Sequence, residues 1–137
     1  MQTGNFHTAR RLPGAIAISR TVPWFYHGKT YPRLAPAADE LRDLKDGLIG
    51  EREYMDTYEC RILGPLDAAA VHDELVALAA PHEPVLLCWC SAAERRCHRF
   101  AAAAWLERKL GISIREYGTD GQTTINELPE QNISKGA

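Results

Sequence analysis

The sequence contains no long hydrophobic run. No stretch approaches the roughly eighteen apolar residues that a transmembrane helix requires. The apolar segment that follows Arg10 and Arg11, from Ala15 to Ile18, is also too short for the core of a secretory signal. We therefore expect a cytoplasmic protein with no membrane partner.

Neither sign of charge predominates. Sixteen Lys and Arg residues stand against eighteen Asp and Glu residues, a net charge of −2. This balance argues against a uniformly basic surface that binds nucleic acid indiscriminately, although it is compatible with a local basic patch. Four cysteines without an export signal indicate thiols in a reducing compartment.

Three apolar segments predict strands. They are Gly14 to Ser19, Pro84 to Cys90 and Ile112 to Tyr117. The second is apolar on both faces, which is typical of a central strand in a parallel sheet covered by helices. Helical spacing between glycine and proline stops predicts helices over Pro36 to Asp46, Glu51 to Leu63, Ala68 to Ala80 and about Cys97 to Leu110.

Together these elements predict one domain. With 137 residues and 45% hydrophobic residues, the chain is typical of a single compact α/β domain, whose small, mainly parallel sheet of about three strands is flanked by helices. We expect an N-terminal extension over residues 1–13, the α/β domain over 14–117, and a polar C-terminal tail over 118–137.

A basic cluster follows the predicted central strand. The segment Glu94-Arg-Arg-Cys-His-Arg99 places three arginines, a thiol and an imidazole at a helix start. Ligands of α/β sheets gather at the carboxyl ends of strands, and an anion would offset the positive charge there. We therefore expect Arg99 and Arg20 to bind an anionic ligand, with Arg96 as a helper. Alternatively, these arginines face water or pair with acids such as Glu94.

The same residues resemble a known family. The strand Pro84-Val-Leu-Leu-Cys-Trp and the later Cys97-His-Arg helix start are similar to the hallmark of the short form of the domain of unknown function 488 (DUF488). Further similarity lies upstream, at Ile18-Ser19-Arg20, Tyr31-Pro32, Leu34-Ala-Pro36, Leu44-Lys-Asp-Gly47 and Glu53-Tyr54. The resemblance covers about Ala15 to Tyr117 and implies a compact α/β fold with a small parallel sheet. It implies no established reaction.

Cys90 departs from this family pattern, because relatives usually have Glu at that position. A thiol does not replace a carboxylate as a general acid or base near neutral pH. It can instead be a nucleophile or a ligand, and Cys90 and Arg96 have the Cys-x5-Arg spacing of phosphatase-like loops. Such loops rely on glycine where this chain has Ala93, so we regard this as the lesser alternative.

Metal binding is a further alternative. Cys88, Cys90, Cys97 and His98 offer donors that zinc accepts, although their spacing is not that of a zinc knuckle. Free cysteines are also commonly buried as apolar residues. We expect no cofactor, with zinc at these four residues as a minor alternative.

An aromatic segment lies between the first predicted strand and the first long helix. Within the long ordered loop from Arg20 to Leu34, Trp24 and Tyr31 accompany His27, Lys29 and Arg33. Such a mixture suits stacking on a base or covering a ligand, and the simpler interpretation is that the rings pack the loop onto the core.

Two functional hypotheses follow. In the first, a nucleotide or other phosphorylated metabolite is bound by Arg20, Arg99 and Arg96 under Tyr31 or Trp24, and Cys97, His98 or Cys90 provides any reactive group. In the second, the basic cluster is the docking surface of a non-catalytic module that binds nucleic acid or protein. A closed pocket favours the first hypothesis and an open basic face favours the second.

Overall fold

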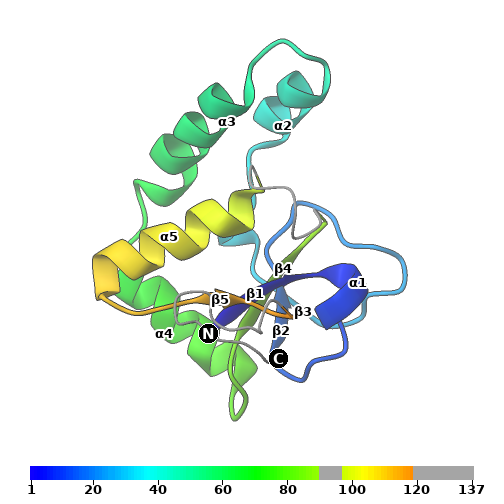
Figure 1. The fold of residues 1–137 in the computed structure, drawn as a ribbon, viewed down its shortest axis with the longest axis vertical. Coiled ribbons are helices and arrows are strands. Elements are labelled where there is room, and N and C mark those ends of the chain that lie inside the picture. The colour runs from blue at the N-terminus through cyan, green and yellow to red at the C-terminus, as the bar shows by residue number, and fades with distance from the viewer. Residues whose placement is uncertain (90–96, 119–137) are drawn as a thin grey trace, which may run out of the picture.

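A five-stranded parallel sheet forms the centre of the protein. The computed structural model describes residues 1–89 and 97–118, and its strand order is β3-β2-β4-β1-β5 (Figure 1). The strands are β1 (Gln2–Asn5), β2 (Ala15–Ala17), β3 (Lys29–Thr30), β4 (Val85–Cys88) and β5 (Arg115–Glu116). All pairings are parallel. The prediction of a single α/β domain with a small parallel sheet is confirmed, but the expected number of about three strands is wrong.

The two strands that the sequence did not predict are β1 and β3. The expected N-terminal extension, residues 1–13, supplies β1, which lies between β4 and β5, and the short helix α1 (Phe6–Ala9). No residue from Gln2 to Asn5 is a large apolar one, so no hydrophobic pattern marked this strand. The two residues of β3 lie inside the expected loop and pair with Ile16 and Ala17 of β2.

The four predicted helices are present. They are α2 (Ala38–Lys45), α3 (Glu51–Tyr58), α4 (Ala68–Ala79) and α5 (His98–Leu110). The 3-10 turn η1 (Pro32–Leu34) precedes α2, and the π-helical turn η2 (Glu59–Leu63) follows α3 directly. The Asp67 side chain accepts a hydrogen bond from the Ala69 amide and so caps α4. At its other end α5 stops at Gly111, whose φ of 68° is the left-handed conformation that favours glycine. No helix in the described ranges has the length and apolar character that a membrane span requires.

Alternating residues of the central strands pack on opposite sides of the sheet. Ile16 and Leu86 join the larger core with residues of α4 and α5, whereas Ala17 and Leu87 join a smaller core with Phe6 of α1. Figure 1 shows α4 and α5 on one side of the sheet and α1 on the other. Because both faces are covered, ligand access is left to the ends of the strands, and α2 and α3 lie beyond one of those ends.

Candidate functional site

A cavity of about 460 Å³ lies where β2 and β4 end. The chain leaves β2 toward β3 at one sheet edge and leaves β4, through α5, toward β5 at the other edge. Loops that diverge in this way open a crevice between two neighbouring strands of a parallel sheet. Ser19 to Thr21 border the cavity after β2, and Cys88 and Trp89 border it at the end of β4.

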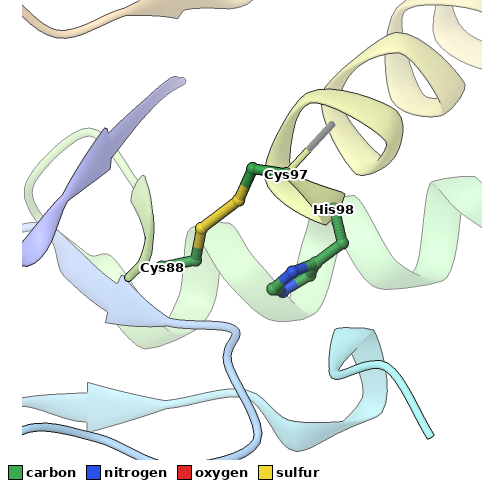
Figure 2. Close-up of side chains that lie close together, drawn as sticks. All are labelled: Cys88, Cys97 and His98. Carbon is green, nitrogen blue, oxygen red and sulfur yellow. A yellow bond between two sulfur atoms is a disulfide. The ribbon is translucent and has the colours of Figure 1, made fainter. Parts of the chain in front are cut away.

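Two cysteines meet at the inner end of this cavity. Cys88 is the last residue of β4 and Cys97 is the N-cap residue of α5, and their sulfur atoms form a disulfide (Figure 2). Both residues are almost fully buried, yet both border the cavity. The disulfide therefore fixes the start of α5 against the end of the central strand.

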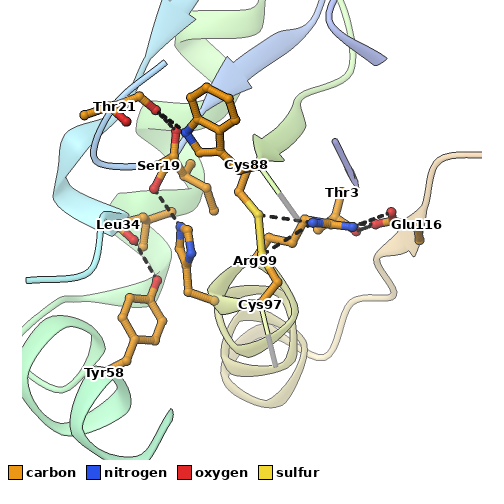
Figure 3. Close-up of a disulfide and its surroundings, with 12 residues drawn as sticks. Thr3, Ser19, Thr21, Leu34, Tyr58, Cys88, Cys97, Arg99 and Glu116 are labelled. Carbon is orange, nitrogen blue, oxygen red and sulfur yellow. Dashed lines mark hydrogen bonds and ion pairs between the residues drawn. A yellow bond between two sulfur atoms is a disulfide. The ribbon is translucent and has the colours of Figure 1, made fainter. Parts of the chain in front are cut away.

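The buried Arg99 contacts both sulfur atoms of the disulfide and does not belong to the cavity lining. Nη1 of Arg99 lies 3.1 Å from Sγ of Cys88 and 3.4 Å from Sγ of Cys97. The rest of the guanidinium donates to Glu116 on β5, from Nη2 to Oε2 at 2.8 Å and from Nε to Oε1 at 3.2 Å. Thr3 of β1 donates to the same carboxylate at 2.6 Å. Figure 3 shows this row of side chains from the disulfide to Glu116.

His98 is the first residue of α5 and lies beside the disulfide (Figure 2). Its Nε2 is 2.8 Å from the carbonyl oxygen of Ile18, which can only accept, so Nε2 carries the proton and donates. Burial, which is opposed by the hydrogen bond to Ile18 and reinforced by the charge of Arg99, lowers the pKa of His98 to about 4. The imidazole is therefore neutral at pH 7, with Nδ1 unprotonated.

Aromatic contacts fix the groups around His98. The Tyr58 ring packs edge-on against the imidazole with 5.5 Å between ring centroids, and its hydroxyl donates to the Leu34 carbonyl at 2.7 Å. On the other side, Nε1 of the half-exposed Trp89 donates to the Thr21 carbonyl at 2.9 Å. These bonds hold the loop after β2 at the cavity wall, as Figure 3 shows.

The remaining cavity wall is cationic and apolar. Its positive charges come from Arg20 and Lys45, and no Asp or Glu belongs to the described part of the lining. The apolar part comes mainly from α2 and α3 and consists of Pro36, Leu41, Leu44 and Tyr54. A ligand that is anionic at one end and apolar at the other matches this wall.

The structure brings some of the sequence-predicted site residues together. Arg20, Cys97 and His98 line the cavity. Arg99 does not: it is fully buried, and its guanidinium is bound by Glu116 rather than presented to a ligand. Cys90 and Arg96 lie outside the described residues. The phosphatase-like loop that their spacing suggested therefore lies outside the described residues as well.

The two aromatic residues expected to cover a ligand lie elsewhere. Tyr31 is buried in the larger core and its hydroxyl donates to Glu74, with a pKa raised to about 12 by burial and by that carboxylate. Trp24 is exposed and does not belong to the cavity lining. The expected lid is therefore absent from the described lining, because Tyr31 is needed by the core and Trp24 faces solvent.

Three of the four expected zinc donors do meet. The donor atoms of Cys88, Cys97 and His98 lie within 4.8 Å of one another, whereas Cys90 is outside the described residues. Zinc binds thiolates, and the sulfurs of a disulfide are not thiolates. The observed pairing of Cys88 with Cys97 therefore makes zinc binding less favourable.

Three residues were not selected from the sequence: Trp89 and Lys45 of the cavity wall, and Glu116, the partner of Arg99. Trp89 lies within the predicted strand Pro84 to Cys90 and directly follows the observed β4, and its place at the carboxyl end of a strand is the signal that could have identified it. Lys45, in the last turn of α2, approaches the cavity only through the packing of α2 beyond the strand ends. Glu116 is the partner of Arg99 because β5 pairs with β1, and no local pattern predicts that pairing.

Residues 5–110 match the sequence model described as the active DUF488-N3 subclade. No curated protein and no solved structure matches the chain. The match covers β2, β3, β4 and the described lining of the cavity, and it leaves out β5 and all of β1 except Asn5. The chain therefore belongs to the DUF488 family.

Proposed function

We propose that the cavity binds a small anionic ligand, a nucleotide or another phosphorylated metabolite. The observation that carries this proposal is the charge of the wall, where Arg20 and Lys45 face the cavity and the described lining contributes no carboxylate. Two exposed cations on a concave wall whose described part carries no carboxylate attract phosphate, because a cleft lined by one sign of charge concentrates the electrostatic field on an anion.

The size and apolar part of the cavity support a nucleotide. A volume of about 460 Å³ falls within the range of roughly 300–1,000 Å³ that small-molecule sites occupy. Leu41, Leu44, Tyr54 and Trp89 provide an apolar surface on which a base or other ring can lie. The phosphate would then be bound by Arg20 and Lys45.

We assign the reactive group to Cys97. A dithiol reductant gives the disulfide two electrons and two protons and is itself oxidised to a disulfide. The protein then holds two thiols, one of them at the N-terminus of α5 and beside Arg99. The helix dipole and the guanidinium both favour the thiolate, which is the nucleophilic form of cysteine. His98 lies next to it as a neutral imidazole whose unprotonated Nδ1 can accept a hydrogen bond.

Arg99 then acts as a positioning residue. Its salt bridge with Glu116 leaves it charged and fixed in the interior, with one nitrogen directed at both sulfur atoms. In this proposal Arg20 and Lys45 contact the ligand, whereas Arg99 stabilises the thiolate that faces it.

Ligand protection tests the proposal. The protein is reduced with a phosphine and alkylated with iodoacetamide, and modification of Cys97 is followed by peptide mass spectrometry, with the exposed Cys60 as internal reference. AMP and glucose 6-phosphate are compared with adenosine, the uncharged counterpart of AMP. We expect at least one phosphorylated compound to slow alkylation of Cys97 several-fold without affecting Cys60, and adenosine to have no such effect.

Variants of the cavity wall complete this test. Replacing Arg20 and Lys45 together by Ala should remove the protection, whereas Arg33→Ala, which removes an exposed cation elsewhere, should preserve it. At about 100 times its dissociation constant, a protecting ligand should also stabilise the parent protein by roughly 2.7 kcal/mol. The proposal is wrong if no phosphorylated compound protects Cys97, or if protection persists in the double variant.

The alternative function is a non-catalytic module in which the basic cluster docks nucleic acid or protein, with no Cys97 chemistry. A Cys97→Ser variant distinguishes the two, because it should keep binding in both cases and lose conversion of a protecting ligand only if the site is catalytic. The variant also cannot form the disulfide, so the comparison is made with the reduced parent protein.

A further inference from the structure

A second surface combines the exposed ring of Trp24 and the partly buried ring of Phe25 with cations. Arg10, Arg11, Phe25 and His27 border a shallow pocket of about 310 Å³, and Trp24 adjoins it in sequence. We call these five residues the Trp24 surface. It lies at the junction of α1 with the loop after β2 and shares no residue with the cavity described above.

Trp24 is not used to pack the protein. Its side chain is 88% exposed, compared with 5% for Trp105 in the core and 49% for Trp89 at the cavity. The ring contacts Phe25 edge-on at 5.6 Å between centroids. Together with Phe25, whose ring it contacts, Trp24 presents an apolar surface that a planar ligand can stack on.

The segment that carries Trp24 is held firmly. Tyr26, two residues later, is buried against Phe6, with 5.2 Å between ring centroids. Its hydroxyl donates to the carbonyl of Lys29 at 2.5 Å, which closes the loop. Because the neighbouring Tyr26 is fixed in the core, the exposed ring of Trp24 extends from an ordered base.

Arg11 is the exposed cation of the surface, and Arg10 adds positive charge from a fixed position. The Arg10 guanidinium lies 4.8 Å from the centre of the Phe25 ring and donates to carbonyls of α1, and Arg11 is exposed. Neither arginine forms an ion pair with residues in the described ranges, and no acid lines the pocket there. The surface is therefore positively charged beside its rings.

The other cations of the same loop are engaged elsewhere. Nζ of Lys29 donates to the Leu78 carbonyl, and Arg33 pairs with Glu74 at 3.3 Å. The sequence pointed to these two as the phosphate-binding residues of the aromatic loop. The structure instead puts Arg10 and Arg11 next to the rings of this surface.

We propose that the Trp24 surface binds single-stranded nucleic acid. Bases stack on aromatic side chains, and arginines beside the rings neutralise the phosphates that connect the bases. A duplex fits the surface less well, because its bases are already stacked and paired. This proposal concerns a separate surface and does not depend on the ligand of the cavity.

Fluorescence anisotropy of a labelled twelve-residue oligothymidylate tests the proposal at low salt. We expect the parent protein to bind, and Trp24→Ala to weaken binding by about 5- to 150-fold, the cost of losing one stacked base. Arg11→Ala should reduce the slope of log affinity against log salt by about 0.7. Lys29→Ala and Arg33→Ala are the matched controls and should stay within twofold of the parent.

Three further measurements decide the outcome. Because Trp24 is exposed, Trp24→Ala should retain the parent's thermal unfolding, which shows that any loss of binding is local. An oligomer of the same length without bases should bind much more weakly, and equal binding would show attraction to phosphates alone and overturn the proposal. Unchanged binding by Trp24→Ala, no binding at low salt, or a parallel loss in the cavity variant Arg20→Ala would also overturn it.

Discussion

His98 makes the stability of the folded protein depend on pH. The pKa of this residue falls from its ordinary 6.5 to about 4 because the imidazole is buried. Between these values the unfolded chain takes up a proton that the folded protein excludes. Stability is therefore fully present above pH 6.5 and is lost as the pH falls toward 4.

The expected loss from His98 is about 2 kcal/mol between pH 7.5 and pH 5. Urea unfolding at several pH values measures it. A His98→Gln variant keeps a donor for the Ile18 carbonyl and should show a smaller decrease, whereas His72→Gln, at a partly exposed position on α4, should behave like the parent. Equal pH dependence in parent and His98→Gln would contradict the prediction.

At the same scale, the sequence located individual site residues better than it located their roles. Arg20, Cys97 and His98 could be selected because each lies at the end of a predicted strand or the start of a predicted helix. Arg99 was expected at the ligand but lies buried beside the cavity, because a charged residue at a helix start gives no sign of which way its side chain points. Its partner, Glu116, is provided by the sheet and not by the local sequence.

Elements α5 and β5 are joined by the ion pair of Arg99 and Glu116. Both side chains are almost completely excluded from solvent. Removing one charge of a buried pair leaves the other uncompensated, which commonly costs about 3–5 kcal/mol. Glu116→Gln should therefore destabilise the protein strongly in chemical denaturation.

The control for this variant is an exposed ion pair. Arg61 pairs with Asp39 between η2 and α2, and both side chains are about half exposed. Asp39→Asn should leave the unfolding midpoint unchanged within error, because water already screens that pair. A Glu116→Gln variant as stable as Asp39→Asn would show that the link between α5 and β5 contributes little.

Helices were predictable at the scale of elements, and two strands were not. Leucine spacing, the Asp67 cap and the stop at Gly111 are local signals that determine where helices begin and end. Strand β1 has no such signal, since Gln2, Thr3, Gly4 and Asn5 become a strand only by pairing with β4 and β5. The two residues of β3 likewise depend on β2.

For the whole molecule, the position of β1 predicts that the N-terminal segment is essential for folding. Deletion of residues 2–9 removes a strand that pairs on both sides, together with Phe6 of the smaller core. We expect the shortened chain to lose cooperative thermal unfolding, as followed by circular dichroism. A cooperative transition near that of the parent would show that the sheet does not need β1.

The sheet order also explains why the sequence predicted where the cavity lies but not which residues line it. The rule that ligands bind at carboxyl ends of strands identified the segments after β2 and β4 as candidates. That these strands are neighbours, and that their outgoing chains diverge to opposite edges, is a property of the topology. The contributions of α2 and α3 to the wall depend on tertiary packing for the same reason.

The lengths of the outer strands have a consequence for solubility. An open sheet presents unpaired backbone groups at its edges, where another chain can add a strand and start aggregation. Within the described sheet, both edges are only two residues long, Lys29–Thr30 in β3 and Arg115–Glu116 in β5, and each carries charge. Such short, charged edges offer a poor template for an added strand, so the fully parallel sheet is protected against edge-to-edge association.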